Sequence, residues 1–426
     1  MSSIQGNVSV QSGIENLGGT SVDISIDEIN LENSWVVVFP RHNTSAQSHD
    51  VTGTLINSNT LRLEREADAG TNNISWFVIE DSNATVQRGV FEMNSSSDDD
   101  TISIDEVDLT KSFISISVRS TSGGMNIGYV TSTFETSSSL RFRRQQTGAS
   151  VFISWQVVTI NDAIVQSGFE TVSGGSLNVN IDSVNLENSF LVMQRSAEEQ
   201  NLNRSHLRGS FNNNSQINFS RNNQSDTMQV SWFVVSCDRY SVQEVNSGST
   251  NNETVNISIN QVDLNKSFIY ASTENSGGGS STANARWNTY FNNNQSVIRH
   301  KESTSQTTWM TGYVVEMSAF ESAIAQINWN NSNMQKVEIG ISDVEFEFIA
   351  PRNVGRFDLR VKNDIGSLTL TFPINVVWVQ GEPDWSEMEI DDETIIVFLY
   401  DGEYYYAEAL HSNQTEFKNS LFFGGM

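Results

Sequence analysis

The sequence predicts an all-β protein, with four tandem small antiparallel β-sandwich repeats followed by a distinct C-terminal β domain. Three observations lead to this prediction. Proline occurs only four times, and Val, Ile, Phe and Trp supply most of the apolar residues, which favours strands. Apolar and polar residues alternate in short runs, while helical periodicity is absent almost everywhere. Three kinds of landmark also return in a fixed order at a spacing of roughly 78 residues.

The first landmark is a Trp-centred strand with a Val-Gln ending. It reads "TNNISWFVIEDSNATVQRG" (71–89), "VFISWQVVTINDAIVQSG" (151–168), "MQVSWFVVSCDRYSVQEV" (228–245) and, in degenerate form, "TWMTGYVVEMSAF" (308–320). The second landmark reads "INLENSW" (29–35), "VDLTKSF" (107–113), "VNLENSF" (184–190) and "VDLNKSF" (262–268). The third reads "LRLERE" (61–66), "LRFRRQ" (140–145), "INFSRN" (217–222) and "VIRHKE" (297–302). The expected repeats are therefore 8–87, 88–166, 167–243 and a degenerate 244–329, with a C-terminal domain over 336–426.

The first repeat reads as a set of strands. "SVDISID" (21–27) alternates as a half-buried strand does, and "SWVVVFPR" (34–41) is a nearly continuous apolar run. "DVTGTLI" and "TLRLERE" form a hairpin with its turn at 57–59. "NISWFVIE" is the last strand and runs directly into the next repeat. This join leaves little linker, so we expect a stiff rod of sandwiches.

Aromatic residues at repeated positions are expected to fill the cores of the sandwiches. They are Trp76, Trp155, Trp232, Trp35, Phe113, Phe190 and Phe268. The three Trp residues of the first landmark could instead be platforms on which sugars stack. The Val-rich run after each of them favours the core.

The segment after the repeats alternates in strands of its own. Within 372–410, a strand ends at Trp378, a Gly-x-Pro turn follows at 381–383, and "IIVFLYDG" (395–402) leads to "YYY" (404–406). Asp401-Gly402 is a favourable hairpin turn. This arrangement resembles a segment near the ends of tailed-phage virion proteins, and the resemblance implies a virion origin.

The repeats resemble the H-type lectin domain, because they open on "VQSG" (10–13, 165–168) and close on "ISW" with a short apolar run ending in Glu80. The resemblance covers roughly residues 8–320. It implies six-stranded antiparallel sandwiches, a trimer, and binding of N-acetylgalactosamine-type sugars near subunit interfaces. The sequence departs from the family in two places. The family's arginine on the middle hairpin strand is replaced by Thr54, Thr133, Ser210 and Thr289, and its Trp-His pair has no counterpart.

Charge and composition exclude several classes of protein. The net charge of −27 disfavours binding to nucleic acid and to anionic membranes. The single cysteine, Cys237, excludes an intrachain disulfide framework. No apolar run reaches the roughly 18 residues that span a bilayer, so no membrane insertion is expected. The start carries no signal peptide, so we expect synthesis in a host cytoplasm and release as part of a virion.

Arginines of the third landmark are the candidate contact residues, for a ligand or for a neighbouring subunit. They are Arg62, Arg65, Arg141, Arg143 and Arg144. They could grip a sugar carboxylate or an acidic subunit face. They could equally keep an exposed strand soluble.

Catalytic and metal-binding signals are weak. Acidic runs at 95–100 and 389–393 make calcium the one candidate cofactor, although neither has EF-hand spacing. Five histidines, at 42, 49, 206, 300 and 411, do not repeat between units, and no hydrolase, nucleotide or zinc-protease motif occurs. We therefore expect no catalytic residue, no metal and no enzymatic activity.

The leading hypothesis is a virion structural protein, either a tail fibre or spike or a capsid decoration, that contributes to host-surface recognition. Its expected partners are copies of itself, as a trimer, other virion proteins and a host-surface glycan. The alternative is a multivalent carbohydrate-binding lectin or adhesin of a microbe. A polysaccharide-degrading tailspike ranks below both, because it needs paired carboxylates in a groove.

Overall fold

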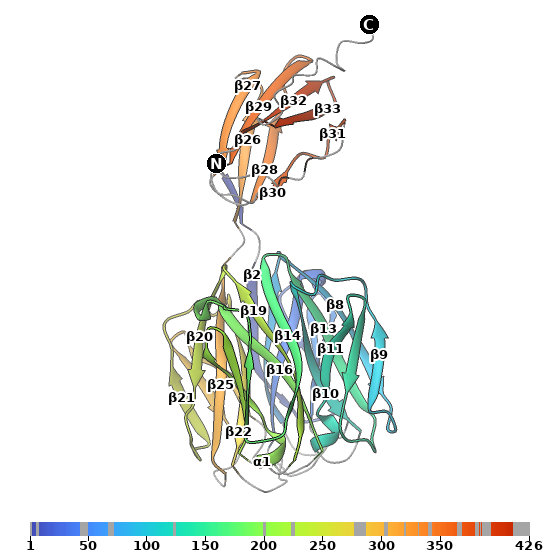
Figure 1. Ribbon diagram of the computed structural model, residues 1–426, viewed down its shortest axis with the longest axis vertical. Helices are drawn as coiled ribbons and strands as arrows, with labels where there is room; N and C mark the ends of the chain where they lie inside the picture. The colour runs from blue at the N-terminus through green and yellow to red at the C-terminus, as the bar shows by residue number, and fades with distance from the viewer. Residues whose placement is uncertain are drawn as a thin grey trace. The chain divides into compact units, whose positions relative to one another are not determined.

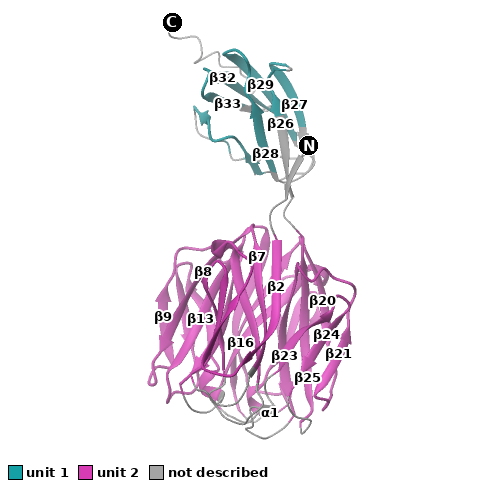
Figure 2. Cartoon of the chain, turned by 180° about the vertical axis from the view of Figure 1, so that it is seen from behind, with its two compact units in different colours: residues 1–6, 320–426 teal, residues 7–319 magenta. Residues whose placement is uncertain are grey.

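A computed structural model gives the fold. It describes residues 2–5, 8–42, 50–66, 72–121, 125–198, 202–222, 226–276, 287–301, 306–318, 321–330, 332–339, 343–363, 369–379, 383, 385 and 393–411. The chain forms two compact units (Figures 1 and 2). Residues 7–319 form one unit, and residues 1–6 together with 320–426 form the other.

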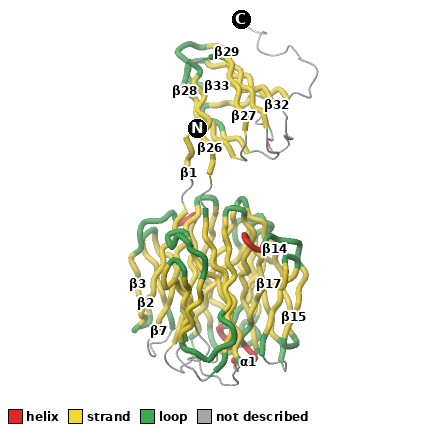
Figure 3. Tube along the Cα trace, turned by 90° about the vertical axis from the view of Figure 1, so that its left-hand side faces the viewer, coloured by secondary structure: helices red, strands yellow, loops and turns green. Residues whose placement is uncertain are grey.

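The unit of residues 7–319 confirms the predicted fold class. Its described residues form eight three-stranded antiparallel sheets, two for each repeat, together with short helical turns (Figure 3). In each repeat the middle strand of the first sheet carries the first landmark, and the middle strand of the second sheet carries the third landmark. We call these the inner and outer sheets. The inner sheets are β2-β7-β4, β8-β13-β10, β14-β19-β16 and β20-β25-β22, and the outer sheets are β3-β6-β5, β9-β12-β11, β15-β18-β17 and β21-β24-β23.

The strand bounds repeat closely from one unit to the next. The first repeat contains β2 (Val8–Leu17), β3 (Ser21–Ser25), η1 (Leu31–Asn33), β4 (Ser34–His42), β5 (Thr52–Asn57), β6 (Thr60–Glu64) and β7 (Asn72–Asp81). The second contains β8 (Ala84–Met93), β9 (Asp99–Ser103), β10 (Ser112–Ser120), η2 (Met125–Gly128), β11 (Thr131–Thr136), β12 (Ser139–Arg143) and β13 (Val151–Ile160). The third contains β14 (Ala163–Val172), β15 (Ser176–Asn180), η3 (Leu186–Asn188), β16 (Ser189–Ala197), α1 (Leu202–Ser205), β17 (Arg208–Asn213), β18 (Gln216–Ser220) and β19 (Met228–Cys237). The fourth contains β20 (Tyr240–Asn246), β21 (Thr254–Ser258), β22 (Ser267–Asn275), β23 (Asn288–Asn293), β24 (Ser296–His300) and β25 (Thr308–Met317).

The second landmark is a turn that delivers an aromatic residue to the inner sheet. In the first repeat the Asn30 side chain accepts a hydrogen bond from the Glu32 backbone N–H, which starts the short helix η1. Ser34 then donates its hydroxyl to the Asn30 carbonyl at 2.6 Å, and Trp35 follows in β4. Asp108 plays the part of Asn30 in the second repeat. This local bonding explains why the motif returns in every repeat.

The first landmark is a cross-strand pair of a glycine and a tryptophan. Gly13 lies opposite Trp76 in the inner sheet, and Gly168 lies opposite Trp232. A Cβ atom on Gly168 would lie 2.5 Å from Trp232 Cζ2, so the indole requires a glycine there. The fourth repeat has the inverse pair, in which Val245 lies opposite Gly312. In the degenerate repeat the glycine has therefore moved to the other strand of the pair, and a valine stands where the other repeats have glycine.

The four repeats close into a ring within one chain, so the expected stiff rod is wrong. The outer strand of each repeat packs on the inner sheet of the next, in the pairs β5 with β13, β11 with β19, β17 with β25 and β23 with β7. The last of these contacts joins the fourth repeat to the first. A continuous join between sandwiches is compatible with either a rod or a ring. The contact of the fourth repeat with the first shows that the repeats form a ring.

One aromatic residue from each repeat meets at the axis of the ring. Trp35, Phe113, Phe190 and Phe268 are each fully buried. Neighbouring rings lie edge to face, with centroids 6.4 Å apart for Trp35–Phe113, 6.2 Å for Phe113–Phe190, 6.0 Å for Phe190–Phe268 and 6.0 Å for Trp35–Phe268. Edge-to-face contact is favourable for aromatic rings. We call these residues the axial quartet.

The seams between repeats carry polar contacts at equivalent positions. Ser75, the serine of "ISW", donates to the Thr289 carbonyl at 2.8 Å, and Ser154 donates to the Gly53 carbonyl at 3.0 Å. The eighth residue of each inner strand makes a different contact at each seam. These residues are Arg41, Arg119, Ser196 and Glu274. Their contacts are Arg41 Nη1 with His300 Nε2 at 3.0 Å, Arg119 Nε with Glu66 at 2.6 Å, Ser196 Oγ with Gln145 N at 2.7 Å and Glu274 with Arg208 Nε at 3.5 Å.

The other unit is a β-sandwich that contains both the start and the end of the chain. Its four-stranded sheet has the order β1-β26-β28-β30, and its five-stranded sheet has the order β27-β29-β32-β33-β31. The strands are β1 (Ser2–Gln5), β26 (Glu321–Asn328), β27 (Met334–Ile339), β28 (Asp343–Ile349), β29 (Gly355–Asn363), β30 (Thr369–Thr371), β31 (Val376–Trp378), β32 (Glu393–Tyr400) and β33 (Tyr405–His411). The range expected for the fourth repeat, 244–329, therefore crosses the division between the units, because β26 belongs here. Gly402 has a φ of 111° in the hairpin between β32 and β33, where a glycine was expected.

The glycine–tryptophan pair predicts a strong coupling between two positions. Gly168→Val should cost about 1–3 kcal/mol of unfolding free energy, because the valine overlaps the Trp232 indole. In a Trp232→Gly background, which copies the fourth repeat, the same valine should cost almost nothing. Equilibrium urea unfolding of the four variants measures this coupling. Gly174→Val is the control, since open space surrounds Gly174. An equal cost of the valine in both backgrounds would contradict the prediction.

Candidate functional site

The exposed candidate arginines bind carboxylates of their own outer sheets. Arg62 Nε donates to Asp23 at 2.7 Å, and the hydrogen bond from Arg62 holds the pKa of Asp23 below its ordinary value. Arg141 forms the same pair with Asp99 at 2.7 Å. Asp23 on β3 lies directly opposite Arg62, whereas Asp99 on β9 lies opposite Arg143 and is reached diagonally by Arg141. These contacts stabilise the two outer sheets.

The other three candidate arginines also contact this chain. Arg65 is 1 % exposed and donates to the Gly19 carbonyl at 2.8 Å. Arg144 is buried and donates to the carbonyls of Ser97 and Ala149, both at 2.7 Å. The Arg143 guanidinium lies 4.7 Å from the centre of the Phe169 ring, across the seam with the third repeat. The five arginines do not converge on one site.

The candidate core aromatics are buried or nearly so. Trp76 and Trp232 are buried, Trp155 is half-buried and packs against the same core, and the axial quartet is fully buried. The indoles of Trp76, Trp155 and Trp232 lie across glycines of the neighbouring strand, so this face of each ring is covered. A sugar platform needs an open face, and these positions offer little of one.

The positions that replace the family's arginine lie at the seams. Thr54 Oγ1 is 3.1 Å from Ser154 Oγ of the next repeat. The Thr289 backbone exchanges hydrogen bonds with Ser75. Thr133 and Ser210 occupy the position of Thr54, opposite Arg141 and Asn218. Thr289 lies opposite Arg299, as Gly53 lies opposite Leu63, so Thr289 is one residue away from the equivalent position in the fourth repeat. Thr54 and Thr289 both contact the neighbouring repeat.

Metal and nucleophile candidates receive little support from the described residues. Among them, no group of three His, Cys, Asp or Glu side chains is placed to hold a metal ion. In the acidic run 95–100, Asp99 and Asp100 bind Arg141 and Ser97. The run 389–393 lies outside the described residues except for the start of β32. Burial, aided by the charge of Asp162, raises the pKa of Cys237 to about 12, so its thiol stays protonated at neutral pH.

His206 is buried and meets Tyr129 edge to face, whereas His300 contacts Arg41 at a seam. His49 lies outside the described residues, and the side chains of His42 and His411 do as well.

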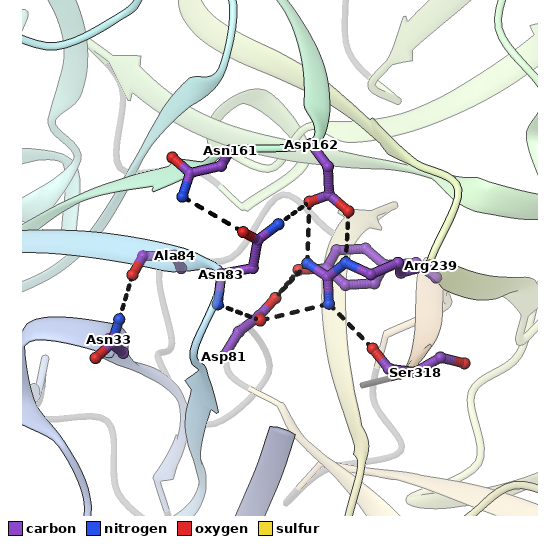
Figure 4. Close-up of polar contacts among 9 residues, drawn as sticks. Asn33, Asp81, Asn83, Ala84, Asn161, Asp162, Arg239 and Ser318 are labelled. Atoms are coloured by element: carbon purple, nitrogen blue, oxygen red, sulfur yellow. Dashed lines mark hydrogen bonds and ion pairs between the residues drawn. The ribbon is translucent and has the colours of Figure 1, made fainter. Parts of the chain in front are cut away.

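A polar cluster closes one end of the ring (Figure 4). It lies at the four turns that follow β7, β13, β19 and β25. Arg239 donates from Nη2 to Asp81 at 2.9 Å, from Nε to Asp162 at 2.5 Å and from Nη1 to the Ser318 carbonyl at 3.0 Å. Asp81 and Asp162 belong to the first and second repeats, and Ser318 belongs to the fourth. One guanidinium from the third repeat therefore contacts all three other repeats. We call this cluster the axial clasp.

The axial clasp is held in its charged form. Burial works against the charge on Arg239, but the hydrogen bond to Asp162 and the charge of Asp81 outweigh it and raise its pKa. Burial likewise works against the carboxylate of Asp162, yet Arg239 holds the pKa of Asp162 below its ordinary value. Asp81 is fully buried and also accepts a hydrogen bond from Tyr240 at 3.0 Å. One guanidinium thus faces two carboxylates, and hydrogen bonds from Asn83 and Tyr240 add to their stabilisation, so the clasp has a structural role.

A hollow lies on the axis on the other side of the quartet. It has a volume of about 220 Å³ and is lined by the inner strands β4, β10, β16 and β22 and by Trp287 and Thr289. A neighbouring hollow of about 180 Å³ shares Val38, Ser117 and Met193 with it. Among the described residues that line the larger hollow, Arg195 has the one charged side chain. Clasp, quartet and hollow therefore follow one another along the axis.

The two ends of the ring differ in their connections to the rest of the chain. Val8 pairs with Asp81, and Ser318 binds Arg239, so the chain enters and leaves the ring at the clasp end. The inner strands run away from that end and finish at His42, Ser120, Ala197 and Asn275. The four connections that follow them have unrelated sequences, unlike the rest of the repeats. The hollow end is thus the end at which the repeats are least alike.

Reasoning from the repeats missed the clasp, although a signal was present. Asp81 occupies a position at which the other repeats have Ile160, Cys237 and Met317. A charged residue at a repeated apolar position needs a partner. The position of Arg239 gives no such signal, because Asn83 and Asp162 occupy it in the first two repeats. Comparison between repeats at single positions would therefore have pointed to Asp81.

No family model matches this chain, and no curated protein matches it. Of the helices that the structure describes, none has the length and apolar character that a membrane span requires.

The axial clasp predicts that Arg239 and Asp81 depend on each other. Arg239→Met should lower the free energy of unfolding by about 3–5 kcal/mol, because it leaves Asp81 buried without a counter-charge. Adding Asp81→Ile, the residue of the second repeat at this position, should recover most of the loss. Urea unfolding followed by tryptophan fluorescence measures both. Arg62→Met is the control, since its exposed ion pair contributes at most about 1 kcal/mol. Failure of Asp81→Ile to recover stability would show that the charge balance is not the reason.

Proposed function

We propose that this protein is a virion structural protein, a tail fibre or spike or a capsid decoration, that contributes to recognition of the host surface. The observation that carries the proposal is the difference between the two ends of the ring. The chain enters and leaves at the end locked by Arg239, while the opposite end has an axial hollow and four dissimilar connections. An attachment module needs such a division between a tethered end and a free end.

The interior of the ring supports a structural role. The quartet, the clasp and the seams fix the four repeats against one another without a metal or disulfide among the described residues. A module fixed in this way loses little conformational entropy when it binds, which favours recognition by several weak contacts. The resemblance of residues 372–410 to a segment of tailed-phage virion proteins supports the same proposal. The proposal assigns no reaction to the protein.

The oligomeric state is part of the proposal. The H-type lectin resemblance implies a homotrimer, in which sandwiches of different chains meet. Here the sandwiches meet within one chain, since β23 of the fourth repeat packs on β7 of the first. The repeat-to-repeat contacts therefore need no second chain, and any trimer would use other surfaces.

A microbial lectin or adhesin is the second candidate. The six-stranded repeats favour it, because they agree with the sandwich that the H-type lectin resemblance implies. It predicts four equivalent sugar sites for each chain. The seam positions argue against this, because Thr54 and Thr289 already contact the neighbouring repeat.

Mass spectrometry of purified particles tests the proposal directly. We expect this chain among the structural proteins of a virion, at a constant copy number per particle. Its absence from particles made by cells that express it would refute the proposal. Binding of a glycan with a stoichiometry of four per chain, together with that absence, would establish the lectin instead.

A further inference from the structure

The fourth repeat differs from the other three at two buried positions. Arg299 lies on β24, the middle strand of its outer sheet, opposite Thr289 of β23. Its equivalents in the other repeats are Leu63, Phe142 and Phe219. Trp287 occupies the position of Val51, Val130 and Leu207. All of these residues are buried, and Arg299 is 0 % exposed. A guanidinium and an indole thus replace two aliphatic or aromatic core residues in this repeat alone.

A second buried cation lies beside the first. Lys301 is also 0 % exposed, at the position where the other repeats have Arg65, Arg144 and Arg221. It donates to the Gln306 carbonyl, as those arginines donate to carbonyls of their own repeats. The Arg299 guanidinium carbon is 3.4 Å from the centre of the Trp287 rings, and Lys301 Nζ is 5.1 Å from it. Both cations therefore lie against the same indole.

No carboxylate balances this charge among the described residues. Arg299 donates to the hydroxyls of Ser247 and Thr308, which are neutral. Glu253 acts on Lys301 only through space. Burial lowers the pKa of Arg299 to about 9. Burial also lowers the pKa of Lys301 to about 8, with repulsion from Arg299 adding to the effect. Two unmatched buried cations are costly, and a protein keeps such a pair where something compensates it.

Two hydrogen-bond donors of the cluster have no acceptor among the described residues. Arg299 Nε and the Trp287 indole Nε1 are both buried, and neither donates to an atom of this part of the chain. They belong to two side chains in direct contact. One acceptor with several oxygens can therefore receive from both. Trp287 also lines the axial hollow, so the cluster adjoins that hollow.

We propose that Trp287, Arg299 and Lys301 bind a small oxyanion, such as sulfate or phosphate, either as a free ion or as an ester group on a ligand in the axial hollow. An oxyanion would supply the missing negative charge and accept the two unused N–H groups in charge-assisted hydrogen bonds. The site exists once per chain, since the other repeats lack Arg299. It stands independently of the proposed particle role.

Thermal unfolding and calorimetric titration of the full chain test the proposal. Sodium sulfate should raise the unfolding midpoint above that in sodium chloride of equal ionic strength, with saturation at low concentration, and titration should give one site per chain. Arg299→Leu with Trp287→Val, which restores the residues of the first repeat, should abolish the saturable rise. Arg62→Ala, which removes an exposed arginine, should keep it. General salt effects of sulfate do not saturate and would act on all variants alike.

The outcomes separate the two sources of the anion. Tighter binding of a sulfated monosaccharide than of sulfate would identify an ester on a larger ligand, and the reverse would identify the free ion. Equal midpoints in sulfate and chloride, or a saturable rise that survives in the double variant, would overturn the proposal. Because the double variant restores core residues of another repeat, we expect it to fold, and its own midpoint in chloride verifies this.

Lys301 adds a measurement that does not use a ligand. The pKa of Lys301 is about 8 in the folded chain, compared with 10.5 for an ordinary lysine. Between pH 8 and 10.5 the unfolded chain therefore binds more protons at this residue than the folded chain does. In chloride, Lys301 should therefore make the protein more stable as the pH rises from about 8 to 10.5, and sulfate should reduce this rise. Buried tyrosines with raised pKa values, Tyr240 and Tyr313, act in the opposite direction, so the comparison is with Lys301→Met. An identical pH dependence in both proteins would overturn the assignment of an uncompensated charge to Lys301.

Discussion

Each repeat ends its second landmark with a large aromatic ring, and the contacts among the four rings join the repeats. Trp35, Phe113, Phe190 and Phe268 are fully buried and pack edge to face. Burial of such a side chain contributes about 1.5–3 kcal/mol. Each ring touches two neighbours, so the loss of any repeat would expose parts of two others. The quartet thus makes the four sandwiches one cooperative body, although each has its own hydrogen-bonded sheets.

Nearly equivalent repeats could in principle pair in a wrong order or with another chain. The seams differ enough to oppose this. Arg119 meets Glu66 at one seam, while Glu274 meets Arg208 at another, with the charges reversed. Exchange of the two neighbours would bring like charges together, which is unfavourable in a partly buried place. The clasp adds a further distinction, because Asp81 and Arg239 occupy positions at which the other repeats have different residues.

The sequence was sufficient for the strands and insufficient for their assembly. Alternation and turn residues depend on local bonding, such as the Asn30 cap, and a local pattern in the sequence therefore predicts them. Ring closure depends on contacts between the first and fourth repeats, such as Ser75 with Thr289, which no local pattern records. The arginines were identified as contact residues because they repeat. The clasp and the cation pair were missed because Arg239 and Arg299 do not repeat, and averaging over repeats hides such positions.

The pairing of β1 with β26 has a consequence for how the chain is made. Ser2 pairs with Ile324, so β1 belongs to a sheet whose other strands are synthesised only after the ring. The whole ring is inserted between them. Closing so long a loop has an entropic cost, and folding of the ring reduces that cost by bringing Val8 and Ser318 to the same end. A closed ring therefore favours the pairing of β1 with β26, because it shortens the effective loop between these two strands.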